Sequence, residues 1–190
     1  MIRTAMAGGL AAFATFAANA EPLTYNIDPR HTFPQYEINH MGFSLQRGRF
    51  DKTEGTIVLD LDAHKGSVEV VIDTASVNTG EPKLDERLKG GDFFDVKNFP
   101  RMTFRASNLA FEGDVLKKAS GELTIRGITK PVTFDADFFK CGNSLVALRK
   151  VCGADLSARI RRSDFGMGYG IPAVGDEVLL RVNVEAIGPR

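Results

Sequence analysis

Residues 121–138 read GELTIRGITKPVTFDADF, and this stretch decides the fold. Leu123 and Ile125 stand at alternate positions before a turn predicted over 127–131, and the alternation of apolar and polar residues resumes at Val132. A period of two places one set of side chains on an apolar face and the other on a wet face, as in a half-buried β-strand. Because a short link with Gly and Pro joins the two runs, we predict an antiparallel hairpin.

The same alternation recurs along most of the chain. Turns with Gly, Pro, Asn or Asp separate the runs, so neighbouring strands are expected to pair as hairpins. Eight or nine strands result, which is enough for a closed barrel or a sandwich. The apolar members, run by run, are Val68, Val70 and Ile72; Met102, Phe104 and Ala106; Val132, Phe134, Ala136 and Phe138; Leu156, Ala158 and Ile160; and Val178, Leu180, Val182, Val184 and Ala186.

One segment has a helical pattern instead. Residues 82–89 read PKLDERLK, with Leu84 and Leu88 on one helical face. Proline suits the first turn, and two glycines after Lys89 end the helix. Residues 92–99, with three phenylalanines, are predicted to form a second helical turn or a loop. The segment either covers an open end of the barrel or is a surface crossover that plugs the core.

The N-terminus has the pattern of a secretory signal peptide over residues 1–20. A positive residue, Arg3, precedes a run of small apolar residues over 5–18, and Ala18-Asn19-Ala20 offers a signal-peptidase site. The run is short for a membrane anchor, which needs about 20 apolar residues. We therefore predict cleavage, export to the periplasm, and one mature domain over 21–190.

Charge and cysteine usage narrow the class of protein further. The 24 basic and 24 acidic residues balance, so no net field would recruit nucleic acid. In an exported chain, Cys141 and Cys152 are interpreted as a disulfide. The alternatives are a metal half-site, which would want histidines nearby in the sequence, and a redox pair, which normally reads C-x-x-C.

No strong catalytic constellation is visible, and we predict no catalytic residue, metal site or cofactor. The chain has no G-x-S-x-G, H-E-x-x-H or P-loop string. His40 shares strand parity with Tyr36 and Ile38 and could point inward. A lone inward histidine is more often a hydrogen-bonded core residue than a base.

Bulky apolar residues crowd the predicted inner faces. An eight-stranded barrel is near the size at which the interior either fills with side chains or holds one small ligand. The alternation pattern does not choose between the two. The candidates for inward positions are Tyr36, Ile38, Phe50, Met102, Phe104, Leu123, Ile125, Phe134, Phe138, Leu156 and Ile160.

The chain also resembles the YceI-like family of lipid-binding proteins. The matching strings follow one another along nearly the whole mature chain, and the longest is GELTIRGITKPV. They are YNID at 25–28, HMG at 40–42, RGRF at 47–50, DFFD at 92–95 with Phe99-Pro100, Thr103-Phe104, GELTIRGITKPV at 121–132, RSDFGM at 162–167 and VGDEV at 174–178.

The resemblance implies a lipocalin-like antiparallel β-barrel with an elongated apolar cavity for a long isoprenoid lipid. Family members carry such chains as polyprenyl phosphates or isoprenoid quinones, and the pair Cys141/Cys152 followed by Gly153 looks like the quinone-associated subgroup. The chain departs from the pattern at Asn39, where an arginine commonly precedes the HMG string. The loss of that charge is expected to alter head-group recognition.

We therefore predict a carrier for an isoprenoid lipid, a monomer or homodimer with transient contact to a membrane or membrane proteins. Arg87, His40 and Arg126 are the head-group candidates at the mouth. Two other hypotheses stay open: an enzyme acting on such a lipid with His40 as general base, and a scaffold with a filled core. The predicted ligand-binding residues are Tyr36, Ile38, His40, Met41, Phe43, Phe50, Leu84, Arg87, Leu88, Phe94, Met102, Phe104, Leu123, Ile125, Arg126, Phe134, Phe138, Leu156, Ile160 and Phe165.

Overall fold

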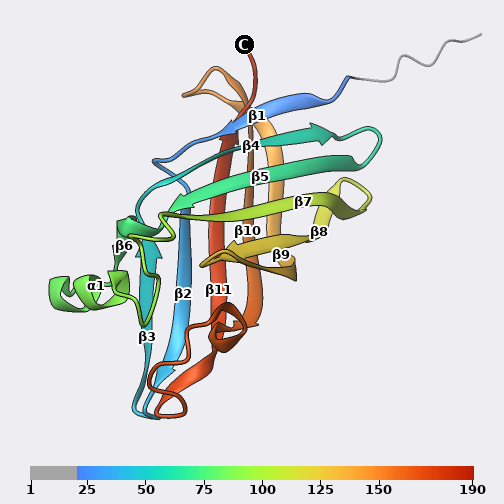
Figure 1. Cartoon of the computed structure of the whole chain (residues 1–190). Coiled ribbons are helices and arrows are strands. Elements are labelled where there is room, and N and C mark those ends of the chain that lie inside the picture. The colour runs from blue at the N-terminus through green and yellow to red at the C-terminus, as the bar shows by residue number, and fades with distance from the viewer. Residues whose placement is uncertain (1–20) are drawn as a thin grey trace, which may run out of the picture.

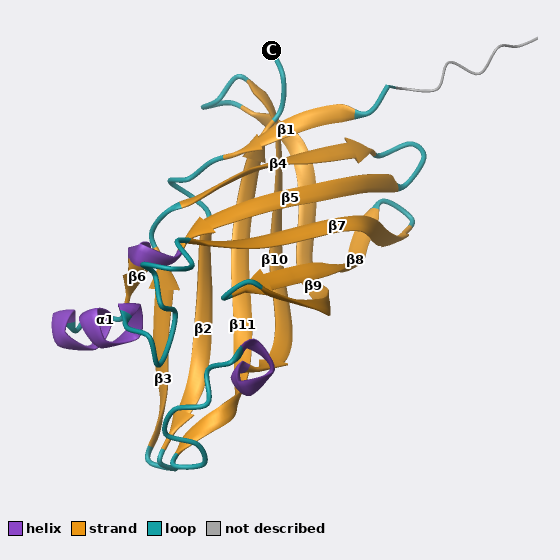
Figure 2. Ribbon diagram, viewed as in Figure 1, coloured by secondary structure: helices purple, strands orange, loops and turns teal. Residues whose placement is uncertain are grey.

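The computed structural model describes residues 21–190 (Figure 1), so the predicted signal peptide over 1–20 lies outside the described residues. Strands dominate the described part, which contains one α-helix (Figure 2). The elements are β1 (Leu23–Ile27), β2 (Phe33–His40), β3 (Ser44–Phe50), β4 (Thr53–Asp60), β5 (Lys65–Asp73), η1 (Thr74–Ser76), β6 (Val77–Asn78), α1 (Pro82–Lys89), β7 (Arg101–Glu112), β8 (Val115–Ile125), β9 (Ile128–Ser144), β10 (Arg149–Arg161), η2 (Arg162–Phe165) and β11 (Val174–Ile187).

Eight of the strands close into a barrel in the order β1-β4-β5-β7-β8-β9-β10-β11. The ring closes where β1 pairs with β11, with Asn26 opposite Ile187 and Ile27 opposite Ala186. Neighbours in the ring pair antiparallel, as short hairpin links require. The predicted all-β barrel with a short helical insertion is confirmed.

The remaining strands extend the sheet on one side of the barrel. Along most of its length β11 pairs with β2, from Val174 to Asn183, and only its last residues reach β1. Strand β3 continues from β2, and the short β6 pairs with β3 through Phe50 and Val77. At the same end of the barrel β9 separates from β10, because their pairing stops at Asp135 and Ser157. The sheet is therefore splayed at the end where β2 and β3 project (Figure 1).

The hairpin of residues 121–138 is present, with a tighter turn than predicted. Strand β8 runs to Ile125 and β9 begins at Ile128, so Arg126 and Gly127 alone make the turn. Both have positive φ, 52° and 72°, as a two-residue hairpin turn requires. Pro131 lies inside β9, in a stretch that pairs with β8 but not with β10, where proline is tolerated.

The predicted inward position of Phe138 is wrong. Leu156 of β10 stands opposite Ala136, but Asp155 stands opposite Phe138, so one extra residue is inserted in β9 at Asp137. A bulge of one residue reverses which side chains face the interior. Phe138 is therefore 53% exposed, and Phe139 takes the inward position.

Gly121 permits a close approach between β7 and β8. A Cβ at this position would lie 2.1 Å from the Arg105 carbonyl oxygen and 2.8 Å from the Ala106 Cα. The pairing of the two strands shifts register just beyond, between Ala106 and Asn108. Before this bulge the even-numbered residues of β7 face inward; after it the inward residue is Leu109, at an odd-numbered position. The close contact between β7 and β8 thus explains why the first residue of the GELTIRGITKPV string is a glycine.

The barrel is packed shut at the end where β1 crosses β11. Tyr25 and Ala186 are both fully buried there. The Tyr25 ring also lies 3.1 Å from the position that a Cβ on Gly188 would occupy, so the last residues of the chain pack against it. Tyr25 and Ala186 therefore pack the interior at this end of the barrel.

Candidate ligand-binding cavity

A cavity of about 550 Å³ runs through the barrel from the packed end toward the splayed end. Its walls are side chains from β2 to β5, α1, β7 to β11 and the segments that follow β6, α1 and η2. The volume lies within the range of roughly 300–1,000 Å³ usual for small-molecule sites. The interior is therefore not filled by side chains, which the alternation pattern left undecided.

Most of the residues predicted to bind ligand contribute to the cavity wall. They come from every part of the barrel, because each strand directs alternate residues inward. The structure brings together Tyr36, Ile38, His40, Phe50, Leu84, Leu88, Phe94, Met102, Phe104, Leu123, Ile125, Phe134, Leu156 and Ile160. Their role in binding ligand remains a prediction.

Six predicted residues do not line the cavity. Met41 and Phe43 lie in and beside the turn between β2 and β3 and are 54% and 87% exposed, because the chain reverses there beyond the barrel. Phe138 is turned outward by the bulge. Phe165 is 1% exposed but packs behind the wall, within η2. The other two, Arg87 and Arg126, hold the covering segment described below.

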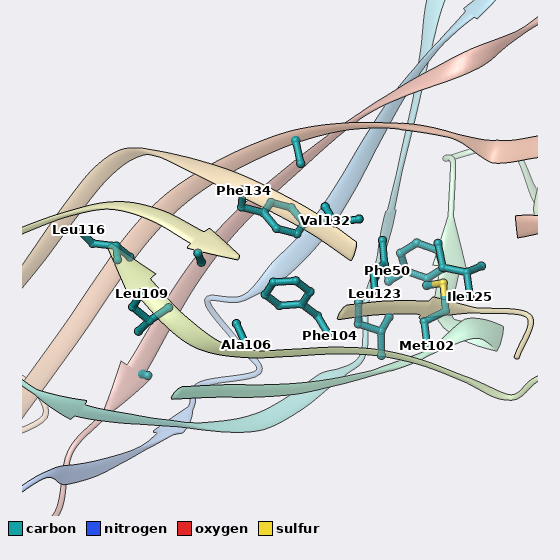
Figure 3. Close-up of a cluster of buried hydrophobic side chains, with 14 of the residues drawn as sticks. Phe50, Met102, Phe104, Ala106, Leu109, Leu116, Leu123, Ile125, Val132 and Phe134 are labelled. Atoms are coloured by element: carbon teal, nitrogen blue, oxygen red, sulfur yellow. The ribbon is translucent and has the colours of Figure 1, made fainter. Parts of the chain in front are cut away.

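Two phenylalanines meet in the middle of the cavity. The rings of Phe104 on β7 and Phe134 on β9 pack edge to face, with centroids 5.0 Å apart (Figure 3). Leu123 of β8, which pairs with Phe104, lies beside them. Such an arrangement leaves flat aromatic surface and aliphatic groups toward the space, which suits an apolar ligand.

Gly48 shapes the wall near the splayed end. The Tyr36 ring of β2 lies across the neighbouring strand, so that a Cβ on Gly48 would be 2.4 Å from the Tyr36 hydroxyl and 2.5 Å from its Cζ. The glycine of the RGRF string therefore makes room for a tyrosine. Burial raises the pKa of Tyr36, and the negative charge of Asp85 raises it further, so the phenol stays neutral.

The segment from α1 to Phe94 covers part of the cavity. Leu84 and Leu88 of α1 and Phe93 and Phe94 after it all contribute to the lining. The Phe94 ring packs edge to face on Phe50, with centroids 5.2 Å apart. Of the two interpretations of this insertion, the structure thus favours a cover.

Arg87 and Arg126, predicted as head-group ligands, hold this cover in place, and their role toward a head group remains a prediction. The Arg87 guanidinium lies 4.7 Å from the centroid of the Tyr169 ring, in the segment after η2, and Phe93 packs on the same ring at 5.7 Å. Arg126 Nη1 donates to the Gly91 carbonyl at 2.7 Å and also to the Phe93 carbonyl. The cover is therefore tied both to the segment after η2 and to the β8–β9 turn.

Arg162 is a structural residue that the sequence did not single out. Its guanidinium is buried and donates to the carbonyls of Gly175 at 2.8 Å, Met167 at 2.7 Å and Val174 at 3.0 Å. Burial lowers the pKa of this group, and the charge of Asp176 opposes that shift. Arg162 thus fixes the segment that carries Tyr169. Although Arg162 begins the RSDFGM string, only the three-dimensional structure shows which carbonyls accept its hydrogen bonds.

Polar side chains gather where β2 and β3 project. His40, Gln46 and Arg47 are exposed there and contribute to the lining. Arg47 is paired with Glu37, whose carboxylate accepts hydrogen bonds from Arg181 Nε at 2.7 Å and Arg47 Nε at 3.0 Å. Those bonds, the one from Arg181 first, hold the pKa of Glu37 below its usual range.

Asn39, at the position where the resemblance predicts an arginine, builds the turn. Its Oδ1 accepts a hydrogen bond from the Gly42 amide at 2.8 Å. Met41 and Gly42 both have positive φ, 56° and 77°, and an asparagine side chain that mimics a backbone acceptor stabilises such a turn. This position therefore supplies no charge to a head group.

The predicted disulfide is confirmed. Cys141 and Cys152 are directly opposite in the β9–β10 hairpin, with Cα atoms 4.1 Å apart, and their sulfur atoms are bonded. Within residues 21–190, no three histidine, cysteine or acidic side chains gather as a metal site would require. No helix in the same range is long and apolar enough to cross a membrane.

Several residues that line the cavity were not predicted from the sequence. Val178, Leu180, Val182 and Val184 carried the alternation signal but were not assigned to the site. Phe139 follows a bulge, so strand parity misplaced it, and Leu109 follows another. Tyr169 lies in a glycine-rich segment without periodicity, and its position depends on Arg162.

Comparison with known proteins gives a consistent result. A family profile described as "YceI-like domain" matches residues 25–186. The protein UPF0312 PSPA7_0523 of Pseudomonas paraeruginosa is 33% identical over 184 residues, covering 96% of this chain and 95% of that one. Protein YceI of Salmonella arizonae is 31% identical over 176 residues, covering 92% and 91%.

Solved structures share the fold. BcnA of Burkholderia cenocepacia superposes with a TM-score of 0.71 at 26% identity, covering 84% of this chain and 99% of that one. A polyisoprenoid binding domain from Saccharophagus degradans gives a TM-score of 0.66 at 19% identity, covering 88% and 99%. The likeness at 19% identity concerns the fold alone.

Proposed function

The chain belongs to the YceI-like family, and from this premise we propose that it is a periplasmic carrier that holds the chain of an isoprenoid lipid inside its barrel. The observation that carries the proposal is the cavity of about 550 Å³, lined mostly by aliphatic and aromatic side chains. The Saccharophagus domain of the same fold is described as polyisoprenoid binding, which supports the same class of ligand.

The energetics of a polyprenyl chain agree with such a cavity. Each methylene moved from water into an apolar site contributes about 0.8 kcal/mol. A free isoprenoid tail in an aqueous compartment is therefore strongly driven into the barrel. The edge-to-face pair of Phe104 and Phe134 offers it preformed apolar surface at mid-cavity. Preformed sites bind apolar ligands without a large cost of ordering the protein.

A neutral quinone head fits the mouth better than a phosphate. The cations near the mouth already have partners: Arg47 pairs with Glu37, and Arg126 and Arg162 donate to backbone carbonyls. Asn39 supplies no charge where an arginine is usual. A phosphate would have to compete for these cations, whereas a quinone carbonyl needs only a neutral donor.

The periplasmic location rests on the predicted signal peptide and on the disulfide. A structural disulfide is typical of proteins in an oxidising compartment. Cys141 and Cys152 are bonded to each other in the structure, which supports a location in such a compartment.

Native mass spectrometry of the purified protein, followed by organic extraction, tests the proposal. We expect a bound mass that extraction releases as an isoprenoid quinone. A protein that carries no lipid when purified from its native periplasm, and takes up none from added quinone, contradicts the proposal. Recovery of a polyprenyl phosphate instead would keep the carrier function and overturn the choice of head group.

Catalysis is tested separately through His40. His40 is exposed at the end of β2 and contributes to the cavity lining. We expect His40→Gln to change lipid occupancy by no more than a few-fold. Chemical conversion of the extracted lipid by the wild type, abolished in this variant, would support an enzyme instead.

A further inference from the structure

Three bulky apolar side chains stand almost fully exposed at the end of the β9–β10 hairpin. Leu145, Val146 and Leu148 are 91%, 96% and 83% exposed. Fully burying such a side chain stabilises a protein by about 1.5–3 kcal/mol, and here that gain is forgone at three positions within four residues. We call residues 145–148 the apolar tip. A contiguous exposed group of this kind marks an interaction site.

The apolar tip is held on a braced hairpin. Cys141 and Cys152 are bonded across its base, and the Gly188 amide donates to the Lys150 carbonyl at 2.8 Å. Inside the turn the Ala147 amide donates to Ser144 Oγ at 3.1 Å. The tip therefore projects from the barrel in a defined direction. In Figure 1 it lies at the top, beside the C-terminus and far from the β2–β3 turn.

The charged residues at the end of the β9–β10 hairpin, which carries the apolar tip, are all cationic. Residues 138–154 contain no aspartate or glutamate, and their charged residues are Lys140, Arg149 and Lys150. Within residues 21–190 none of these three cations takes part in a salt bridge. Glu185 of the neighbouring strand β11 stands opposite Gly153, and its carboxylate is 4.0 Å from His31 Nδ1.

We propose that the apolar tip docks on the surface of an anionic lipid bilayer. Apolar side chains that sink into the boundary between head groups and acyl chains, flanked by cations that meet lipid phosphates, are the combination that binds such surfaces. A second copy of this chain fits less well, because three cations on one tip would repel three on the other. The proposal concerns the packed end of the barrel and is independent of any lipid in the cavity.

Docking by the apolar tip orients the barrel. The splayed end, with its cover and its exposed polar side chains, lies at the opposite end of β11 and therefore faces away from the bilayer (Figure 1). The protein would be held at a membrane with the cavity mouth turned toward the aqueous compartment.

Flotation with vesicles tests the proposal, using phosphatidylcholine alone and a mixture with phosphatidylglycerol. Two triple variants are compared with the purified wild type: Leu145→Ser/Val146→Ser/Leu148→Ser and Lys140→Gln/Arg149→Gln/Lys150→Gln. Phe43→Ser is the matched control, because Phe43 is 87% exposed at the opposite end. The substituted positions are exposed, except for Arg149, which is half-buried at the start of β10, and thermal melts with intact-mass measurement of the disulfide check that each variant is folded.

The wild type is expected to float with the anionic vesicles and much less with the neutral ones. Removing the apolar side chains should lower the partition coefficient about tenfold or more. Removing the cations should lower the partition coefficient about fivefold for each charge at low salt. At high salt the cation variant should bind as well as the wild type does. Phe43→Ser should bind as the wild type does.

Three outcomes would overturn the proposal. The wild type does not float with anionic vesicles; the apolar variant floats as well as the wild type; or Phe43→Ser loses binding to the same extent. If light scattering shows that the apolar variant turns a dimer into a monomer while vesicle binding is unchanged, the occupant of the tip is a second copy. Loss of lipid from the cavity in any of these variants is a separate readout, so failure of the carrier function is distinguishable.

Discussion

The two ends of this barrel both expose large apolar side chains, yet they are built differently. At the packed end Leu145 and Val146 project from a braced hairpin whose cations form no salt bridge within residues 21–190, and Tyr25 is fully buried in the barrel at this end. At the splayed end Phe43 is 87% exposed beside the β2–β3 turn, whereas Tyr169, 53% exposed, lines the cavity in a segment, residues 166–175, that carries no charged side chain. Exposure alone therefore does not say what a surface does; the charges beside it and the space behind it do.

The largest expected effect is at the packed end. Tyr25 is fully buried among well-packed neighbours, so Tyr25→Ala should lower the free energy of unfolding by about 3–5 kcal/mol. Chemical denaturation of lipid-free protein measures it. Tyr25→Phe is the matched control: the Tyr25 hydroxyl is buried without a hydrogen-bond partner among residues 21–190, so its removal should cost nothing. An equal loss in both variants would show that the hydroxyl, not the packing, matters.

The disulfide should contribute nearly as much. Replacing Cys141 and Cys152 together by serine removes a cross-link between residues 11 apart in the sequence and should lower the free energy of unfolding by about 2–4 kcal/mol. A thermal melt of the double variant beside the oxidised wild type checks this. If the comparison of the ends is right, quinone retention should be much less affected than stability.

At the splayed end, Gly48→Ala should be the most damaging small substitution. The added Cβ would lie 2.4 Å from the Tyr36 hydroxyl oxygen and 2.5–2.7 Å from two atoms of its ring, and overpacking of this kind costs about 1–3 kcal/mol. The double variant with Tyr36→Ala should regain part of that loss, because the clashing ring is gone. Additive losses in the double-mutant cycle would contradict the steric explanation.

In the middle of the cavity, Phe134→Ala should lower lipid retention more than it lowers the stability of the fold. Phe134 faces open space on one side, so its removal should cost the lipid-free protein less than the 3–5 kcal/mol typical of a phenylalanine in a filled core. Lipid retention should fall instead. Phe134→Trp should retain the fold and lose ligand, since added volume is tolerated only where space exists. A Trp variant that unfolds would mean that the interior is packed.

The smallest effect concerns the ion pairs of Glu37 at the splayed end. Hydrogen bonds from Arg181 and Arg47 lower the folded-state pKa of Glu37, so they stabilise the fold above the unfolded-state pKa. That contribution is lost as the pH falls through the lower, folded-state pKa. Glu37→Gln should lower the free energy of unfolding by about 1 kcal/mol or less at neutral pH. In this variant the free energy of unfolding should also fall less steeply as the pH is lowered. Glu69→Gln, on the outer face of β5 and 53% exposed, should change less.

Strand parity could be predicted from the sequence wherever a strand is regular. The inward positions from Met102 to Ala106 and from Val178 to Ala186 follow directly from alternation, because a pleated strand has a period of two. The same rule misplaced Phe138 and passed over Phe139. A single inserted residue at Asp137 reverses which side chains of β9 face inward, and no local sequence pattern predicts this insertion.

The family strings, the disulfide pair and the apolar face of α1 could also be recognised from the sequence, since each depends on short-range spacing. The empty volume of the cavity, the use of Arg87 and Arg126 to hold its cover, and the buried Arg162 on three carbonyls were decided only by the tertiary structure. These features join segments far apart in the chain, and whether an interior is filled depends on how all its walls pack at once.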